Sequence, residues 1–108
     1  MISLQVIDSP NKDELGKYTY QFEELLIGAT LNNDLILSNQ ENKSDRLRLV
    51  IVKEELILET LSLNQFVLLN RKKFSGRLKL KPGDLVKFGD CEFKIIEFSQ
   101  YKSQDTFP

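Results

Sequence analysis

The 108-residue sequence predicts a single all-β domain, built as a sandwich or barrel of about ten short strands. Short apolar segments recur along the chain, and residues that favour turns separate them at close intervals. No segment shows a convincing helical pattern. A chain of this length buries roughly two thirds of the surface that it exposes when unfolded, which suffices for one hydrophobic core without a metal or a disulfide.

The first half of the chain is expected to form four strands and two long loops. The strands are predicted at residues 3–8, 17–22, 25–27 and 35–37, with loops at 9–16 and 28–34. The second strand alternates strictly, so that Tyr18, Tyr20 and Phe22 share one face. In the second loop, Gly28 and Asn32–Asp34 favour left-handed backbone conformations. A loop held between two buried strands is a good platform for recognition.

The second half of the chain is expected to contribute six more strands. They are predicted at residues 46–52, 56–60, 66–70, within 71–81, and at 85–88 and 91–98. Leu47, Leu49 and Ile51 lie on one face of the first of them. Turns are predicted at residues 53–55, at 81–84 as a type II turn, and at 89–90 as a two-residue hairpin loop. Residues 1–98 are expected to form the domain, and the polar residues 99–108 a tail or a linker.

Composition argues against several classes of function. The chain has no histidine and one cysteine, so the commonest general base and the commonest zinc ligands are missing. We therefore predict no enzyme activity, no catalytic residue, no metal and no cofactor. A net charge of −1 gives no overall field that would attract nucleic acid or an anionic membrane, so neither is expected as a partner.

The cysteine and the N-terminal segment bear on where the protein resides. A lone cysteine, Cys91, cannot form an internal disulfide and fits a reducing compartment. The first residues lack the basic start and apolar core of a signal peptide. No apolar run approaches the roughly 20 residues that span a bilayer. We expect a cytoplasmic domain without direct membrane insertion, in which Cys91 is a buried strand residue.

Six segments carry a resemblance to a known family. They are Ile27-Gly28, Asn33–Leu37, Ser44, Ser62–Asn64, Leu80–Asp84 and Phe88-Gly89. In order and spacing they resemble the forkhead-associated (FHA) domain, over about residues 17–98. The resemblance implies a β-sandwich of about ten to eleven short antiparallel strands, whose loops at one end bind phosphothreonine peptides. The family's turn glycines match here at Gly28, Gly83 and Gly89.

The sequence departs from the family pattern at the residues that hold phosphate. Where the family has an arginine after its first glycine, this chain has Ala29. The family's Ser-Arg-x-His segment reads Ser44-Asp45-Arg46-Leu47, so the arginine is replaced by an acid and the histidine by leucine. In the family's Asn-Gly segment, Asn64 matches and Gln65 does not.

These departures predict a degenerate FHA-like module that binds a protein or peptide partner without phosphate. Phosphate recognition of this kind depends on charge-assisted arginine contacts, and the loss of one typically costs about 2–5 kcal/mol. Asp45 would repel a phosphate that carries a charge of about −2. Such domains serve as regulatory or cytoplasmic parts of larger signalling or secretion assemblies. The candidate partner-binding residues are Ala29, Asn32, Asn33, Lys43, Ser44, Arg46, Asn64 and Arg71.

Several alternatives stay open from the sequence. A phosphothreonine-peptide reader is one, if Lys43, Arg46 or Arg71 takes the place of the missing arginine. A structural domain that oligomerises is another, and a weak homo-oligomer would fit it. Ser44 and Asn64 could also simply stabilise loops through bonds from side chain to backbone.

The segment 71–81 carries six cations and no acid. The simplest interpretation is a strand with one solvated basic face, because Leu78 and Leu80 alternate with the last cations. The functional interpretation is a docking patch for an acidic protein surface. Nucleic acid is less favoured, since the chain as a whole is not basic.

Overall fold

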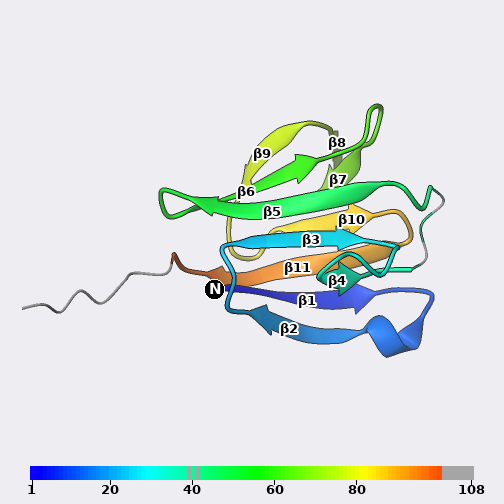
Figure 1. Ribbon diagram of the computed structural model, residues 1–108, viewed down its shortest axis with the longest axis horizontal. Helices are drawn as coiled ribbons and strands as arrows, with labels where there is room; N and C mark the ends of the chain where they lie inside the picture. The colour runs from blue at the N-terminus through cyan, green and yellow to red at the C-terminus, as the bar shows by residue number, and fades with distance from the viewer. Residues whose placement is uncertain (39, 41, 101–108) are drawn as a thin grey trace, which may run out of the picture.

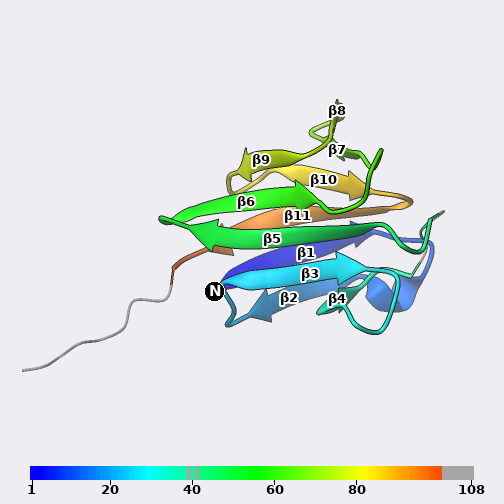
Figure 2. The ribbon, with the colours of Figure 1, turned by 45° about the horizontal axis from the view of Figure 1, so that its top comes forward.

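Two β-sheets packed face to face form the computed structural model, which describes residues 1–38, 40 and 42–100 (Figures 1 and 2). One sheet has six strands in the order β2, β1, β11, β10, β7, β8. Their bounds are β1 Ile2–Asp8, β2 Gly16–Tyr20, β7 Val67–Leu69, β8 Lys72–Phe74, β10 Leu85–Phe88 and β11 Cys91–Phe98. The other sheet has five strands in the order β4, β3, β5, β6, β9. Their bounds are β3 Glu24–Gly28, β4 Leu35–Ile36, β5 Arg46–Val52, β6 Glu55–Thr60 and β9 Arg77–Leu80.

The predicted all-β sandwich is confirmed, but one strand pair departs from the antiparallel arrangement. Strands β3 and β4 run parallel, with Ile27 opposite Leu35. The cause is the loop after Gly28, which folds back along β3. The Asp34 N–H donates to the Leu26 carbonyl (2.8 Å), and the Leu26 N–H donates to the Asp34 carboxylate (2.8 Å). Because Asp34 is held beside Leu26, β4 starts level with the middle of β3 and runs in its direction.

The core lies between the sheets and is filled by the inward residues of each strand. Leu47, Leu49 and Ile51, predicted to share one face, are all buried in β5. From the six-stranded sheet, Phe88 and Phe93 are the largest fully buried side chains. Alternation of apolar and polar residues is what places these side chains on one side of their strands.

Two predicted strands are shorter than expected. The strand predicted at 17–22 ends at Tyr20, and Phe22 lies beyond it and is 49% exposed. Phe22 stacks on Tyr20 with ring centroids 5.9 Å apart, so its apolar area is covered by a neighbour rather than by the core. The strand predicted at 66–70 is reduced to β7, and Phe66 is 48% exposed.

The basic segment 71–81 does not form a single strand. Asn70 and Arg71 both have positive φ (49° and 73°) and form a two-residue turn that reverses β7 into β8. The chain then crosses at Ser75 and Gly76 into the five-stranded sheet, where β9 pairs with β6. Half of the predicted basic face therefore lies on each sheet. Sequence alternation missed the turn because neither Asn70 nor Arg71 is a glycine.

A buried carboxylate, Glu14, organises the loop between β1 and β2. It ends a short 3₁₀ helix, Lys12–Glu14, in the segment predicted as a loop. Its carboxylate accepts bonds from the Ser9 hydroxyl (2.8 Å), the Ser38 hydroxyl (2.6 Å), the Ser38 N–H (3.0 Å) and the Asn11 amide (3.5 Å). Burial opposes ionisation, but the bonds from Ser38, Ser9 and Asn11 outweigh it and hold the pKa of the Glu14 carboxyl below its ordinary value.

The two ends of the domain meet at the end of the sandwich where the N-terminus lies (Figure 1). The Met1 amino group donates to the Ser99 carbonyl (2.7 Å), and the Ser99 N–H donates to the Met1 carbonyl (2.9 Å). The Gln100 side chain accepts a bond from the Glu54 N–H (2.8 Å). The rest of the predicted tail, residues 101–108, lies outside the described residues.

Replacing Glu14 should destabilise the domain in a pH-dependent way. Because the pKa of Glu14 is lower in the folded than in the unfolded state, the carboxylate stabilises the fold above the unfolded pKa, and this contribution is lost as the pH falls through the folded pKa. We expect Glu14→Gln to lower the free energy of unfolding by about 1–3 kcal/mol at neutral pH. The difference from the parent should shrink in acid, in urea titrations across the pH range. Glu97→Gln, at an exposed strand position, serves as the control and should change little. A deficit that is the same at every pH would contradict this account of Glu14.

The turn between β5 and β6 offers a stabilising substitution. Lys53 and Glu54 have positive φ (53° and 67°), a conformation that costs most residues about 1–2 kcal/mol and that Asn adopts readily. We therefore expect Lys53→Asn to raise the free energy of unfolding by up to about 1 kcal/mol. Lys17→Asn, within β2, should instead lower it, because Asn is a poor strand residue. Thermal unfolding of both variants tests this prediction. The absence of any gain in stability for Lys53→Asn would contradict it.

Candidate functional site

Three loops at one end of the sandwich contain most of the predicted binding residues. They are the β3–β4 loop at 29–34, the β4–β5 loop at 37–45, of which 39 and 41 lie outside the described residues, and the β6–β7 loop at 61–66. Figure 1 shows these loops at the right-hand end, away from the N-terminus, together with the turn between β10 and β11. Arg46 begins β5 at this end. Arg71 lies apart from them, in the β7–β8 turn.

Asn33 links the β3–β4 loop to the start of β5. Its amide nitrogen donates to the carbonyl (2.9 Å) and the hydroxyl (3.0 Å) of Thr30, and its amide oxygen accepts a bond from Arg46 Nε (2.9 Å). The side chain lies against Gly28, where an added Cβ would come within 2.7 Å of the amide nitrogen. Arg46 is thus oriented by a neutral amide, and within residues 1–38, 40 and 42–100 it forms no salt bridge.

Ser44 is used to build its own loop. Its hydroxyl and its backbone N–H both donate to the Asn42 side-chain oxygen (2.7 and 3.0 Å). The Ser62 hydroxyl donates to the Ser44 carbonyl (3.2 Å), which ties the β4–β5 loop to the β6–β7 loop. Lys43 and Asn32 are exposed, and Asn32 accepts a bond from the Thr30 hydroxyl. The loop-stabilising interpretation of Ser44 is therefore the one that matches its contacts.

The β6–β7 loop buries a donor that has no partner. Asn64 is exposed and has a positive φ of 64°, which lets the chain turn and place Gln65 inward. Gln65 is 4% exposed, and its amide oxygen accepts a bond from the Ser62 N–H (2.9 Å). This bond fixes the orientation of the amide. Its nitrogen, Nε2, is buried and has no hydrogen-bond partner among the described residues.

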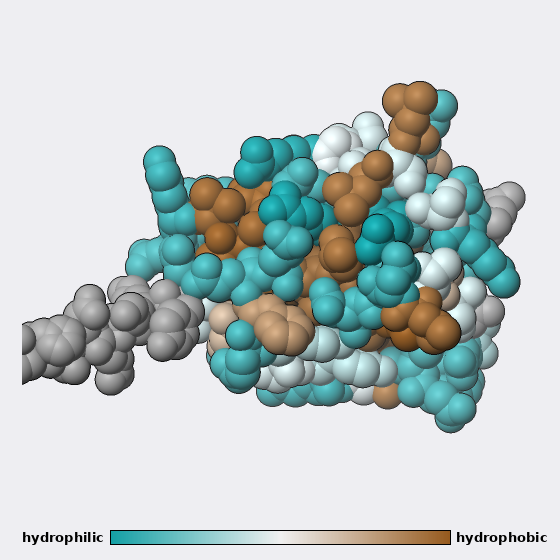
Figure 3. Space-filling model, in the orientation of Figure 1, coloured by the Kyte–Doolittle hydropathy of each residue, from teal (hydrophilic) through white to brown (hydrophobic). Residues whose placement is uncertain are grey.

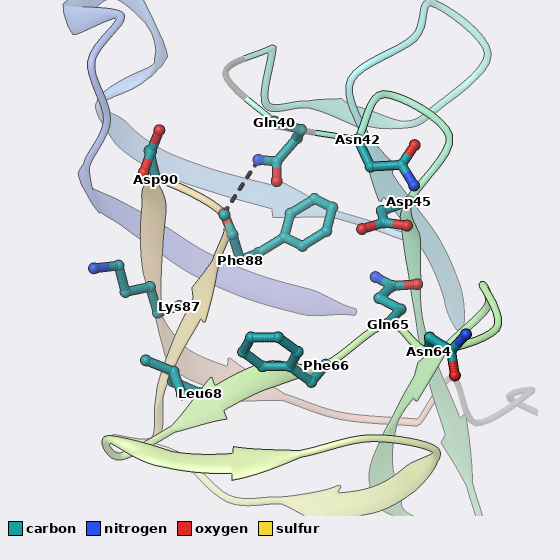
Figure 4. Close-up of a pocket in the computed structure, with 11 residues that line it drawn as sticks. Gln40, Asn42, Asp45, Asn64, Gln65, Phe66, Leu68, Lys87, Phe88 and Asp90 are labelled. Atoms are coloured by element: carbon teal, nitrogen blue, oxygen red, sulfur yellow. Dashed lines mark hydrogen bonds between the residues drawn. The ribbon is translucent and has the colours of Figure 1, made fainter.

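The Gln65 amide nitrogen faces a hollow between the loops, which we call the loop pocket. The loop pocket has a volume of about 340 Å³. It is lined by Gln40, Asn42, Asp45, Asn64, Gln65, Phe66, Leu68, Lys87, Phe88, Gly89 and Asp90. Figure 4 shows the Gln65 nitrogen turned toward the space between the rings of Phe66 and Phe88. The lining therefore combines two aromatic rings, a buried donor, the carboxylates of Asp45 and Asp90, and the single cation of Lys87.

A second buried amide shapes the far wall of the loop pocket. Gln40 is 8% exposed, and its nitrogen donates to the Phe88 carbonyl (3.1 Å). Its oxygen lies so close to Gly89 that any side chain there would overlap it. Gly89 also has a positive φ of 60°, as the predicted hairpin turn between Phe88 and Cys91 requires. Both features require glycine at position 89.

Of the eight predicted binding residues, Asn64 lines the loop pocket. Ala29 is half-buried in the β3–β4 loop, and the remaining residues surround the pocket or lie beyond it. Sequence reasoning missed Gln65 and Gln40. The one signal available was that Gln65 stands where the resembling family has glycine, which marks a changed position but not a buried amide.

Within the described part of the chain, no group of three or more histidine, cysteine, aspartate or glutamate side chains is placed to hold a metal ion. No helix in residues 1–38, 40 and 42–100 is long and apolar enough to cross a membrane. Cys91 is buried as predicted, with its sulfur 3.6 Å from the Ser9 hydroxyl.

Comparison of this domain with solved structures identifies its fold. No family model and no curated protein matches the sequence. The FHA domain of the CT664 protein from Chlamydia trachomatis is similar, with a TM-score of 0.74 and 15% identity over 91% of this chain and 98% of that one. An FHA domain studied for phosphothreonine-dependent interactions has a TM-score of 0.71 and 16% identity, over 92% of this chain and 98% of that one. EmbR of Mycobacterium tuberculosis, in complex with a low-affinity phosphopeptide, has a TM-score of 0.73 and 19% identity, over 94% of this chain and 26% of that one.

The chain therefore has the FHA-domain fold, as the sequence resemblance implied. The likeness covers nearly the whole of this chain and establishes the architecture. The binding chemistry depends on the residues in the loops, because one fold carries many different sites.

Gly28→Ala should disturb the loop end by displacing Asn33. The added methyl group would overlap the Asn33 amide, which would lose its bonds to Thr30 and Arg46. We expect a loss of about 1–3 kcal/mol in the free energy of unfolding and a shift of the Arg46 Nε–H signal in NMR spectra. In an Asn33→Ala background the same change should cost much less, because the clashing atoms are gone. Equal costs in the two backgrounds would contradict the contact.

Proposed function

We propose that this domain is a non-catalytic protein-interaction module, a degenerate FHA-like domain that binds a protein or peptide partner without phosphate. The observation that carries the proposal is the loop pocket, in which the buried Gln65 nitrogen has no hydrogen-bond partner among the described residues. A buried, unsatisfied donor costs about 1–3 kcal/mol, and a bound acceptor would recover much of that loss. The acceptor that fits is a neutral one, such as a backbone carbonyl or a side-chain amide of the partner.

The charge of the loop pocket opposes a phosphate. Among the described lining residues, Asp45 and Asp90 outnumber Lys87, so their ionisable side chains give a net charge of −1. A phosphate at neutral pH carries about −2 and needs cationic donors, arginine above all. At the position where the resembling family has that arginine, Ala29 offers no donor from its side chain. A neutral segment that places an apolar group against Phe66, Phe88 and Leu68 suits this lining better.

A phosphothreonine-peptide reader is the second candidate, and Arg46 is the observation that favours it. Its guanidinium is oriented by Asn33 and forms no salt bridge within the described residues. Two of the solved FHA structures are described with phosphopeptides or phosphothreonine-dependent interactions. Lys43 or Arg71 could contribute only by moving toward the loop end. A structural domain that self-associates is the third candidate, and concentration-dependent sedimentation would support it.

The wider context is also part of the proposal. We infer a cytoplasmic domain that serves as the regulatory or cytoplasmic part of a larger bacterial signalling or secretion assembly. The lone, buried Cys91 supports a reducing compartment. The proposal includes no enzymatic role, because the sequence has no histidine, the commonest general base and the usual activator of a serine or cysteine nucleophile.

An NMR titration of the isotope-labelled domain tests the proposed function. The ligands are a degenerate phosphothreonine peptide library and its unphosphorylated twin. We expect phosphorylation to give no gain in affinity, and any saturable shifts to include the Gln65 side-chain amide and the backbone of Phe66. Saturable shifts that appear only with phosphate, around Ala29, Ser44 and Asn64, would overturn the proposal and assign the phosphate to a substitute cation, Arg46 first.

Gln65→Glu tests the role of the buried donor in that titration. The variant keeps an oxygen for the Ser62 N–H but replaces the unpartnered nitrogen by an acceptor. We expect the unphosphorylated library to lose at least about tenfold in affinity, which corresponds to about 1.4 kcal/mol. Gln5→Glu, at an exposed position of β1, is the matched control. An unchanged affinity in Gln65→Glu would show that the pocket donor is not used.

A further inference from the structure

The β7–β8 hairpin carries positive charge that no acidic side chain of the described chain offsets. In the segment 71–81, Arg77 lies 4.0 Å from Glu59, Lys79 lies 3.4 Å from Glu55, and Lys81 lies 3.2 Å from Asp84. Arg71, Lys72 and Lys73 have no salt-bridge partner among residues 1–38, 40 and 42–100. All three are exposed. The cations on β9 are therefore paired with acidic side chains, whereas those on β8 have no salt bridge among the described residues.

Strand β8 is also the free edge of the six-stranded sheet. It pairs with β7 on one side, and no strand formed by the described residues pairs with it on the other. Asn70 and Arg71 form the two-residue turn, so Leu69 and Lys72 make the hydrogen-bonded pair next to it. Lys73, the next residue, then stands opposite Leu68 in a non-hydrogen-bonded pair. The N–H and C=O of Lys73 point away from β7, toward the open edge.

A groove beside this edge offers room for an apolar side chain. We call it the edge groove, and its volume is about 430 Å³. It is lined by Thr60, Ser62, Leu63, Asn64, Gln65, Phe66, Lys73, Ser75 and Gly76. Leu63 is 92% exposed and Phe66 48% exposed, and Lys73 Nζ lies 4.3 Å from the centre of the Phe66 ring. Figure 3 shows apolar atoms standing out at the tip of the β6–β7 loop, above a polar surface.

We propose that the free edge of β8 binds an extended acidic segment of a partner protein, which adds to the sheet as a further strand. The backbone of the segment would bond to the N–H and C=O of Lys73. Neighbouring residues of a strand point to opposite faces of the sheet, so the acidic side chains of the segment would lie on the face of Lys72. The apolar side chains between them would lie on the face of Lys73, where one would enter the edge groove beside Leu63 and Phe66. The edge groove shares Asn64, Gln65 and Phe66 with the loop pocket, but Lys73 and the edge of β8 lie outside the pocket lining.

Charge selects the partner at this edge. A second copy of the same hairpin would bring the lysines of two β8 strands together, and like charges directly opposite each other destabilise strand pairing. An acidic strand removes that repulsion and replaces it with attraction. The lysines thus oppose pairing between copies of this chain while favouring an acidic partner.

Two blocked peptides test the proposal by NMR titration of the labelled domain. In one, glutamate alternates with valine, and in the other, lysine alternates with valine. We expect saturable shifts at Lys72, Lys73 and Phe74 with the acidic peptide alone, slower hydrogen exchange of the Lys73 amide in the complex, and weaker binding as salt screens the charges. Equal binding of the two peptides, or the absence of saturable shifts at β8, would overturn the proposal.

Charge reversal at the two opposite edges of the sheet provides the matched variants. Lys72→Glu should weaken binding of the acidic peptide at least tenfold. Lys17→Glu, on the exposed face of β2 at the other edge of the same sheet, should leave it unchanged. Both positions are exposed, so the core is untouched. An equal loss in the two variants would show that only the overall charge matters and would overturn the proposal. Tighter binding of a single-stranded oligonucleotide at β8 would also overturn it, as would concentration-dependent shifts at β8 without peptide.

Discussion

The reciprocal bonds between Asp34 and Leu26 are the constraint on which the loop end depends. They return the chain to the middle of β3 and set the parallel course of β4. The turn that precedes them places Asn33 over Gly28, and Asn33 in turn orients Arg46 at the start of β5. A two-residue strand such as β4 has few ladder bonds of its own, so side-chain bonds supply the order that a longer strand would provide.

Several polar side chains described at the loop end bond to groups close by, and this makes the exception informative. The side chains of Asn33, Ser44 and Gln40 each donate a hydrogen bond to a group in the same loop or in a neighbouring segment. The amide oxygen of Gln65 likewise accepts a bond from the Ser62 N–H, whereas its amide nitrogen has no hydrogen-bond partner among the described residues. Most buried polar groups in proteins are paired, so an unpaired one at the wall of a hollow marks a position suited to an outside acceptor. A donor held in place before binding also lowers the entropic cost of recognition.

The sequence predicted what depends on local pattern and missed what depends on distant contacts. Alternation in 46–52 placed the inward face of β5 correctly, because each side chain there follows the period of a strand. The same rule failed at 71–81, because the chain leaves the six-stranded sheet at Ser75 and Gly76 and continues as β9 in the other sheet. The buried state of Gln65 depends on Ser62 and on loops far along the chain, and no spacing in the sequence reveals it. That position 29 carries alanine rather than arginine, in contrast, is read directly from the sequence.

The meeting of Met1 and Ser99 has a mechanical consequence. Strands β1 and β11 are antiparallel neighbours, and the ends of the domain lie side by side at the end remote from the loops. A force that pulls these two ends apart loads the ladder between β1 and β11 one bond pair at a time, as in a zip, rather than shearing all pairs together. We therefore expect the domain to yield at low force when it is stretched between its ends.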